Sequence, residues 1–390
     1  MKTAKRLEGI GEYYFSEKLR EIELLNQQGP RVINLGIGSP DLPPHPDVIR
    51  VLQEESARAD THAYQSYKGV PALRQAMSNW YRRWYGVELD AATEILPLIG
   101  SKEGIMHICM TYLDAGDEAL VPDPGYPTYS SAVRLAGGTV RPYALQAALN
   151  WYPDLAALER AGLSRVKLMF VNYPHMPTGT LPDATFFTRL VQFAEKHQIL
   201  LVHDNPYSFI LNDAPMSLLR LPGAKQVVLE LNSLSKSMNM AGWRVGMLCG
   251  AKEHIDAVLR FKSNMDSGMF LPIQLAAAKA LTLEQDWYDQ VNAVYRRRKE
   301  KALALLDLLG CTYDAQQAGM FVWAAVPNNY ASGFALSDAL LHNSRVFITP
   351  GGIFGAAGSQ YIRVSLCSSE ATFDESISRV ASYLKSENHV

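Results

Sequence analysis

The chain has 390 residues, of which 48% are hydrophobic and 19% are charged, and its formal net charge is −2. This length favours a large globular protein with two lobes, and the composition excludes a disordered chain. The net charge gives no general attraction to polyanions, so we expect no nucleic-acid partner.

The cysteines and the N-terminus favour the cytoplasm. Cys109, Cys249, Cys311 and Cys367 stand far apart without a CxxC pair, as expected of reduced thiols. The first residues, MKTAKRLEGIGEYYF, lack the apolar segment of a signal peptide. No apolar run approaches the ~18 residues that a transmembrane helix needs. We therefore expect a cytoplasmic protein without a membrane partner.

The pattern of apolar residues divides the chain into three parts. Residues 1–44 carry a helical stretch, FSEKLREIELLNQQ, and an arm that packs on a small domain or on another subunit. Residues 45–283 alternate apolar runs such as VKLMFVNYP with amphipathic stretches such as ATFFTRLVQFAEKHQ, which indicates βα units around a mainly parallel sheet. Residues 284–390 predict a smaller α/β domain after a long helix. In parallel sheets the ligand chemistry gathers at the carboxyl ends of the strands.

Two strand ends in the first half carry candidate site residues. TEILPL leads into IGSKEGI, where Gly100, Ser101 and Lys102 open a helix whose free N–H groups favour an anion. An ordinary helix N-cap is the alternative interpretation. The next run ends in VPDPGYPTY and places Tyr126 in a rigid turn. This ring either stacks on a flat ligand or is half-buried packing.

Two later strand ends are also polar. ILLVHDNPY places Asp204 and Tyr207 at a strand end, although Asp-Asn-Pro also forms an ordinary turn. QVVLELNSLSKSMNMAGWRVG places Lys236 between two apolar runs, with Arg244 eight residues later. A buried ammonium without a partner is costly, so a surface lysine is a poor interpretation of Lys236.

The segment SLSKSMNMAGWRVG resembles the cofactor-lysine segment of the class I/II pyridoxal-phosphate aminotransferases, the fold type I family. Seven further motifs occur along the chain in the same order as in the family: INLGIGSPDLPP, YQSYKGVPALRQAM, LIGSKEGI, PDPGYPTY, NYPHMPTG, HDNPY and YIRVSL. The residues of LIGSKEGI and VPDPGYP are most similar to those of the bacterial branch that contains alanine and LL-diaminopimelate aminotransferases. The resemblance implies an α/β fold with a large cofactor domain, whose mainly parallel seven-stranded sheet lies between helices, and a smaller α/β domain.

The resemblance also implies roles for the strand-end residues. Lys236 would hold pyridoxal 5'-phosphate as an imine and later move the substrate's α proton. Asp204 would keep the ring nitrogen protonated, because an adjacent carboxylate stabilises that charge. Tyr207 would hydrogen-bond the phenolic oxygen O3′, and Tyr126 would stack on the ring.

The cofactor's phosphate needs several donors and a permanent cation. By resemblance its ligands are Ser233, Ser235 and Arg244, together with the turn Gly100–Lys102. Tyr64 in AYQSYKG matches a tyrosine that reaches the phosphate from the neighbouring subunit, which implies a homodimer with shared sites.

The substrate's carboxylate also has an implied binding site. Arg363 in YIRVSL matches the arginine that binds it, with backbone help from Ile37 and Gly38 and a side-chain pocket that includes Tyr126. An edge-strand charge is the alternative interpretation of Arg363.

Met176 departs from the family pattern. The family turn reads NPTG, and its asparagine donates to O3′, but a methionine stands here. One interpretation is that Met176 only fills space. A second is that the imine keeps its proton to higher pH, by about 1 pH unit or less, because a donor is lost. A third is a different reaction on the same cofactor, namely carbon–sulfur β-elimination.

The implied activity is transfer of an amino group between an L-α-amino acid and a 2-oxo acid, with a carbon–sulfur β-lyase as the alternative. We expect no metal or nucleotide cofactor, because the chain has no HExxH, no Walker loop and no GxGxxG after a strand. A transcription regulator with an aminotransferase-like domain would need a DNA-reading segment before that domain. The family match begins within the first ~30 residues and leaves no room for such a segment, so we do not expect a regulator.

Overall fold

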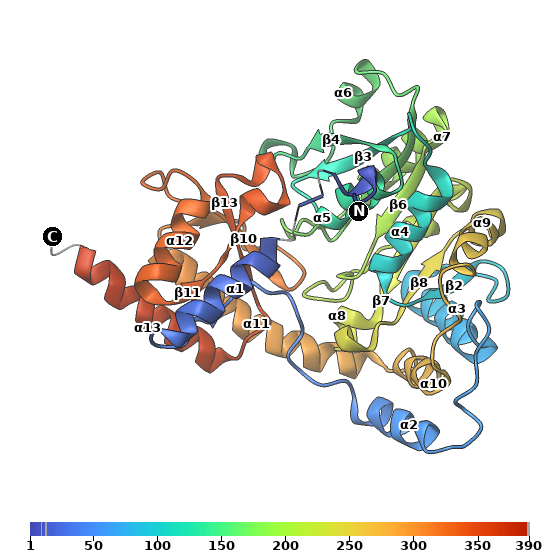
Figure 1. The fold of residues 1–390 in the computed structure, drawn as a ribbon, viewed down its shortest axis with the longest axis horizontal. Helices are drawn as coiled ribbons and strands as arrows, with labels where there is room; N and C mark the ends of the chain where they lie inside the picture. The colour runs from blue at the N-terminus through green and yellow to red at the C-terminus, as the bar shows by residue number, and fades with distance from the viewer. Residues whose placement is uncertain (9, 12–13, 388–390) are drawn as a thin grey trace.

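The computed structural model describes residues 1–8, 10–11 and 14–387 (Figure 1). Its centre is a seven-stranded sheet with the order β2-β8-β7-β6-β5-β3-β4. The strands are β2 (Ile95–Leu98), β3 (Glu118–Asp123), β4 (Thr139–Ala144), β5 (Val166–Val171), β6 (Leu200–Asp204), β7 (Val228–Ser233) and β8 (Gly246–Cys249). Only β8 runs antiparallel to its neighbours, β2 and β7. The mainly parallel seven-stranded sheet is thus confirmed.

Helices cover both faces of this sheet, as continuous apolar strands require. Buried residues of α4 (Ser101–Tyr112), α5 (Pro127–Leu135) and α9 (Lys252–Lys262) pack on one face, against side chains such as Val202. Those of α3 (Pro71–Tyr85) and α7 (Ala184–His197) pack on the other, against side chains such as Leu201. Because alternate residues of a strand point to opposite faces, neighbouring residues of β6 have different surroundings.

A smaller lobe lies beside the large sheet, in the orange and red part of Figure 1. Its antiparallel sheet has the order β12-β13-β10-β9. The strands are β9 (Thr312–Tyr313), β10 (Phe321–Ala325), β12 (Thr349–Pro350) and β13 (Tyr361–Ser365). The helices of this part of the chain are α11 (Gln285–Leu308), α12 (Gly333–Ser344) and α13 (Glu370–Glu387). The long α11 leads from the large sheet into this lobe (Figure 1).

The N-terminal helix α1 (Tyr14–Gln27) lies against the smaller lobe (Figure 1). Lys18 contacts Asp338 of α12 at 3.2 Å, and Arg345 donates to the carbonyl oxygen of Leu25. After α1, β1 (Ile33–Asn34) pairs in parallel with β11 (Val346–Phe347). The expected limits 1–44, 45–283 and 284–390 stay predictions.

Short helices complete the described chain. The α-helices are α2 (Pro46–Ser56), α6 (Leu155–Arg160), α8 (Leu234–Ser237) and α10 (Leu271–Ala280). The 3-10 helices are Lys5–Leu7, Ala147–Leu149, Leu218–Arg220, Ala224–Gln226, Ala241–Trp243, Gly351–Phe354 and Ala356–Gly358. No helix within the described residues has the length and apolarity to cross a bilayer.

Candidate active site

A cavity of about 550 Å³ lies where the large sheet meets the smaller lobe and α1. Its wall includes the carboxyl end of β6, the residues that follow β5 and β7, and the first turn of α4. All but two of the site residues predicted from the sequence line it. They are Ile37, Gly38, Ser101, Lys102, Tyr126, Met176, Asp204, Tyr207, Ser233, Ser235, Lys236, Arg244 and Arg363.

The two remaining residues, Gly100 and Tyr64, lie outside this lining. Gly100 has φ +81°, and a Cβ there would lie 2.2 Å from Nη2 of Arg244. Only glycine therefore lets the guanidinium approach the turn that opens α4. Tyr64 lies outside the cavity of its own protomer, and its side chain is fully open to solvent.

Lys236 reaches the cavity from α8, directly after β7. Its Nζ donates to the carbonyl oxygen of Gly38 at 2.7 Å. Burial lowers the pKa of the Lys236 ammonium, and the neighbouring charges of Arg363 and Arg244 lower it further. Ser233 caps α8 by accepting from the backbone N–H of Ser235, which fixes the start of the lysine's helix. A buried amine of reduced basicity is a competent nucleophile.

Asp204 ends β6 and turns a buried carboxylate toward the cavity. The hydroxyl of Tyr129 donates to its Oδ2 at 2.8 Å, while Oδ1 is buried and has no hydrogen-bond partner within the described residues. Burial raises the pKa of Asp204 to about 6, although Tyr129 and the nearby charges of His203 and Lys236 act in the opposite direction. Asn172 donates to the main-chain oxygen of Asp204 at 2.5 Å. Our sequence reasoning missed Tyr129 and Asn172.

Tyr126 and Tyr207 line the same cavity as neutral phenols. Burial raises the pKa of each hydroxyl above its usual range. The ring of Tyr207 packs edge-on against Phe321, with 5.9 Å between centroids, and the ring of Tyr126 packs likewise against Tyr129. Both side chains can therefore act as hydrogen-bond donors that are held in place by aromatic packing.

Donors gather at the start of α4. The backbone N–H groups of Ser101 and Lys102 open the helix and have no intrahelical acceptor. Ser233, Ser235 and Arg244 line the cavity together with them. A helix N-terminus with a guanidinium and hydroxyls beside it suits a phosphate group.

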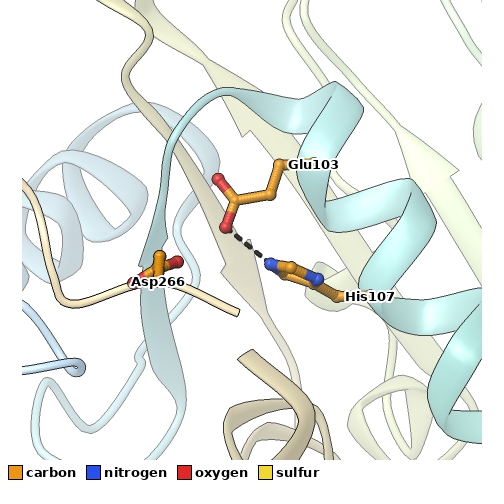
Figure 2. Close-up of side chains that lie close together, drawn as sticks. All are labelled: Glu103, His107 and Asp266. Carbon is orange, nitrogen blue, oxygen red and sulfur yellow. Dashed lines mark hydrogen bonds and ion pairs between the residues drawn. The ribbon is translucent and has the colours of Figure 1, made fainter. Parts of the chain in front are cut away.

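A separate polar cluster holds the first turn of α4 (Figure 2). Oε2 of Glu103 accepts from the N–H of Ile99 at 2.6 Å, and Oε1 lies 2.5 Å from Nε2 of His107. Glu103, His107 and Asp266 could by spacing hold a metal ion. However, the buried ammonium of Lys262 lies 2.5 Å from Asp266 and 3.9 Å from Glu103, so it already supplies the positive charge. The cluster is best explained as an ion-pair anchor.

Arg363 of β13 brings a guanidinium to the opposite side of the cavity. Nη2 donates to the carbonyl oxygen of Gly36, and Nη1 lies 3.3 Å from the sulfur of Met176. The rings of Phe321 and Phe354 lie 3.9 and 4.7 Å from the guanidinium carbon. Carbonyl, thioether and ring faces hold the side chain at the cavity wall, where a guanidinium can bind a carboxylate.

Met176 lies in a buried turn, and its sulfur faces Arg363. Its backbone N–H donates to Oδ1 of Asn172, the residue that also holds the end of β6. A thioether accepts weakly and donates nothing. Asn172 thus fixes the turn, but nothing in the side chain of Met176 replaces an amide donor.

Helix α1 also reaches the cavity, which our sequence reasoning missed. Phe15, Ser16 and Leu19 line it on the side of Arg363, and the ring of Phe15 lies 6.0 Å from that guanidinium carbon. The sequence predicted only that this helix packs on the smaller domain or on another subunit.

The family described as aminotransferase class I and II matches residues 30–380. The chain belongs to the class I and II aminotransferases. It is 41% identical over 388 residues to the LL-diaminopimelate aminotransferase of Dehalococcoides mccartyi strain CBDB1, covering 99% of this chain and all of that protein. The protein of the same name from Moorella thermoacetica is 42% identical over 383 residues, covering 97% of this chain and 98% of that protein.

Solved aminotransferase structures share this fold. The substrate-bound BacF structure from Bacillus subtilis has a TM-score of 0.93 and 34% identity, covering 98% of both chains. A mutant of Thermus thermophilus aspartate aminotransferase has a TM-score of 0.91 and 26% identity, covering 98% of this chain and all of the other. These findings confirm the predicted family, its fold type I architecture and an aminotransferase that depends on pyridoxal phosphate. They give no support to the β-lyase alternative.

The residues present fit pyridoxal phosphate. The unpartnered Oδ1 of Asp204 is a buried acceptor at the cavity wall, as a protonated ring nitrogen requires. Because Gly100 has no Cβ, the guanidinium of Arg244 can lie against the turn that opens α4. A phosphate group requires such a cation. The acceptor Asp204, the cation Arg244 and the amine of Lys236 all line one cavity.

Proposed function

We propose that this aminotransferase binds pyridoxal phosphate in the described cavity and moves an amino group between an L-α-amino acid and a 2-oxo acid. One observation carries the proposal. A buried amine at Lys236, a carboxylate with an open oxygen at Asp204 and a guanidinium at Arg363 line the same 550 Å³ cavity.

Each catalytic residue has a distinct task. Bound pyridoxal phosphate supplies an aldehyde carbon that exchanges amines and a protonated ring that accepts electrons. Lys236 would hold that carbon through its amine and would move the proton at the substrate's Cα. Asp204 would keep the ring nitrogen protonated through its open Oδ1, and Tyr207 would donate toward the ring's phenolic oxygen.

Anchoring residues hold the remaining groups of the cofactor. Tyr126 would support the ring, and Met176 would offer it no donor. The phosphate ligands would be Gly100, Ser101, Lys102, Ser233, Ser235 and Arg244, with Tyr64 from the neighbouring subunit. Neutral donors and cations together match the charge and the acceptor oxygens of a phosphate.

The substrate's carboxylate binds to Arg363, with help from the backbone at Ile37 and Gly38. This support is consistent with the contacts of the loop, because Gly36 accepts from Arg363, Ile37 accepts from Ser365, and Gly38 accepts from Lys236. The loop thereby contacts both Arg363 and Lys236. A substrate that contacts both residues would favour a closed site.

A homodimer with shared sites would bring Tyr64 to its partner's cavity. Three other large hydrophobic side chains on this segment and the adjacent one are exposed like Tyr64: Tyr67, Met265 and Phe270. Their two segments lie side by side, because His62 and Phe270 pack with 5.6 Å between ring centroids. A hybrid of Tyr64→Phe and Lys236→Ala subunits tests the sharing. The hybrid has one site with both native residues, so it should regain activity that neither parent has in full.

The decisive experiment replaces Lys236 by alanine. The variant should lose both the visible absorbance of covalently held cofactor and all turnover. Lys299→Met is the matched control, because this lysine is also partly buried but donates to the carbonyl oxygens of Ala315 and Gln317, away from the cavity. Turnover of Lys236→Ala at the wild-type rate overturns the proposal.

The substrate pair needs a panel of amino acids with 2-oxoglutarate and pyruvate as acceptors. The name of the curated relatives makes LL-diaminopimelate the first donor to test. A spectral change that requires an amino donor and reverses with a 2-oxo acid marks transamination. Pyruvate and ammonia released from cysteine without any acceptor would instead mark β-elimination.

We also propose a cytoplasmic location. All four cysteines are buried free thiols, as a reducing compartment favours.

A further inference from the structure

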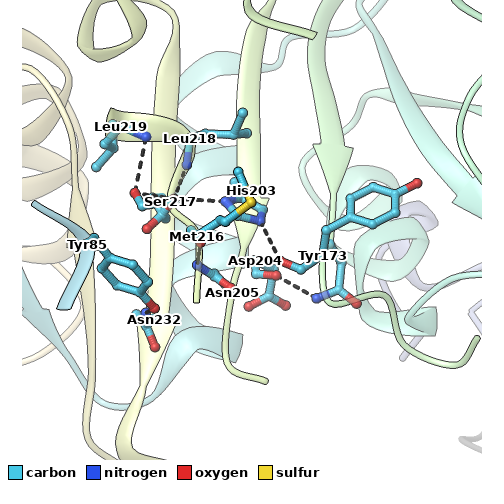
Figure 3. A network of polar contacts seen from close by, with 12 residues as sticks. Tyr85, Tyr173, His203, Asp204, Asn205, Met216, Ser217, Leu218, Leu219 and Asn232 are labelled. Atoms are coloured by element: carbon cyan, nitrogen blue, oxygen red, sulfur yellow. Dashed lines mark hydrogen bonds and ion pairs between the residues drawn. The ribbon is translucent and has the colours of Figure 1, made fainter. Parts of the chain in front are cut away.

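A buried histidine adjoins Asp204 (Figure 3) and contacts a buried glutamate, and the proposed chemistry uses neither of them. His203 is the neighbour of Asp204 in β6, and it pairs in register with Glu230 of β7. Both side chains are fully buried. Because strand neighbours face opposite sides of a sheet, Asp204 faces Tyr129 of α5, while His203 faces Phe187 of α7.

Glu230 is surrounded by donors. Its Oε2 accepts from the N–H of Leu218 at 3.1 Å and from the hydroxyl of Ser217 at 2.9 Å. That hydroxyl already accepts from Leu219, so its own proton is available for Glu230. The hydroxyl of Tyr81 donates to Oε1 at 3.0 Å. Glu230 therefore acts as the acceptor toward three donors besides His203.

The partners of His203 place a proton on each ring nitrogen. Nε2 lies 3.0 Å from the carbonyl oxygen of Tyr173, which can only accept, so Nε2 carries a proton. Nδ1 lies 2.8 Å from Oε2 of Glu230. If Glu230 accepts from Nδ1 as it accepts from its other donors, the shared proton lies on Nδ1. Figure 3 shows the imidazole of His203 beside Tyr173.

We propose that His203 is an imidazolium, ion-paired with Glu230, and that it is a positioning residue which keeps Asp204 ionised for its task in catalysis. This inference rests on the proposed role of Asp204. The positive end of the pair adjoins Asp204 within one strand, whereas the negative end lies on the neighbouring strand. The pair therefore presents a net favourable field to the carboxylate although its own charges cancel.

Within the described part of the chain, few other charges face this pair. The titratable groups around it, taken from every packed element, are Tyr81 and Tyr85 of α3, Tyr173 after β5, Asp204 of β6 and Cys249 of β8. Burial raises the pKa of Tyr81, Tyr85, Tyr173 and Cys249 well above the usual range, so these groups stay neutral. Asp204 is then the anion next to the imidazolium.

A direct test reads the protons of His203 by nitrogen NMR of the holoenzyme with ¹⁵N-labelled histidine near neutral pH. The chain has 9 histidines, and the signal that disappears in His203→Gln identifies the residue. Protons on both nitrogens support the proposal. A single proton, on Nε2, overturns it. This measurement does not depend on what Asp204 does.

The functional test compares Glu230→Gln with Tyr81→Phe. The first removes the negative charge that keeps the second proton on His203, whereas the second removes one hydrogen bond from the same carboxylate and keeps its charge. Glu230→Gln should move the acid limb of the pH profile of kcat/KM upward by about 0.5 to 1 pH unit, so that activity on that limb falls about threefold to tenfold. The plateau should stay close to that of wild type.

Tyr81→Phe should leave the limb where it is in wild type. A limb that stays in place in Glu230→Gln, or that moves equally in both variants, overturns the proposal. If Glu230→Gln does not fold, His203→Gln makes the same comparison, because its amide can still donate to Tyr173. Asp204→Asn tests the proposed role of Asp204 independently of the protonation of His203. An active Asp204→Asn enzyme would refute the proposed role of Asp204, while the NMR result would still decide the state of His203.

Discussion

The ionised carboxylate of Asp204 should lower the stability of the cofactor-free protein, although the proposed catalysis needs it. Burial raises the pKa of this carboxyl from its ordinary value of 3.8 to about 6. At about 1.4 kcal/mol per pKa unit, keeping it ionised in the cofactor-free protein at neutral pH costs about 3 kcal/mol. The pH dependence follows from this sign. As pH falls from about 6 to below about 4, the folded protein takes up a proton earlier than the unfolded chain, and this cost disappears.

Asp204→Asn removes the buried charge at every pH. The hydroxyl of Tyr129 can still donate to the amide oxygen, but the new amide nitrogen takes the place of Oδ1, which has no partner within the described residues. A buried donor without a partner costs at least about 1 kcal/mol. The cofactor-free variant should therefore be more stable than wild type by up to about 2 kcal/mol at neutral pH. Below about pH 4 it should be slightly less stable.

Urea unfolding of both cofactor-free proteins across this pH range measures the difference, in which the other titrating groups cancel. Tyr129→Phe is the matched control. It removes the donor to Oδ2 and should destabilise the ionised carboxylate, so its deficit should grow as pH rises through about 6. A stability difference for Asp204→Asn that does not change with pH refutes the reasoning. Addition of pyridoxal phosphate should reverse the order, because the amide cannot stabilise a protonated ring nitrogen.

Three further variants probe the rest of the cavity. Met176→Asn introduces a donor and should move the visible absorbance transition of the bound cofactor to lower pH by about 1 unit or less, whereas Met176→Leu should leave it unchanged. Equal transitions in all three proteins contradict this. Arg363→Lys loses the bidentate fork and should raise KM for amino acids about tenfold to a hundredfold while cofactor affinity is kept. Weaker cofactor binding with unchanged KM would disprove the assignment. Gly100→Ala brings a methyl group within 2.2 Å of Nη2 of Arg244 and should weaken cofactor binding, as measured by absorbance titration. Wild-type affinity in this variant would argue against the proposed phosphate site.

The strand ends account for what the sequence predicted well. Parallel strands bring their carboxyl ends to one edge of the sheet, so residues after separate apolar runs meet there. Asp204 at the end of β6 and Lys236 after β7 lie more than thirty residues apart in sequence, yet both line one cavity. Arg363 joins them from the smaller lobe, and only the family resemblance pointed to it.

The contacts that the sequence did not predict depend on packing between distant elements. Tyr129 meets Asp204 because α5 covers that face of the sheet, and no local pattern specifies which of its tyrosines points inward. Phe15 reaches the cavity only because α1 packs on the smaller lobe, more than 300 residues further along the chain. The role of Tyr64 stays a prediction, since its expected partner is a second subunit.

Strand β6 shows how the fold can keep a buried anion available. Asp204 ends the strand facing α5, where a single hydroxyl donates to it and one oxygen is left open for the cofactor. More donors on that side would occupy the oxygen that the reaction needs. Positive charge supplied from behind avoids this conflict, because the side chain of the preceding residue faces the other side of the sheet. His203 stands there, and Glu230 offsets the cost of burying its charge. The alternation of a single strand thus separates the group that reacts from the group that supports it.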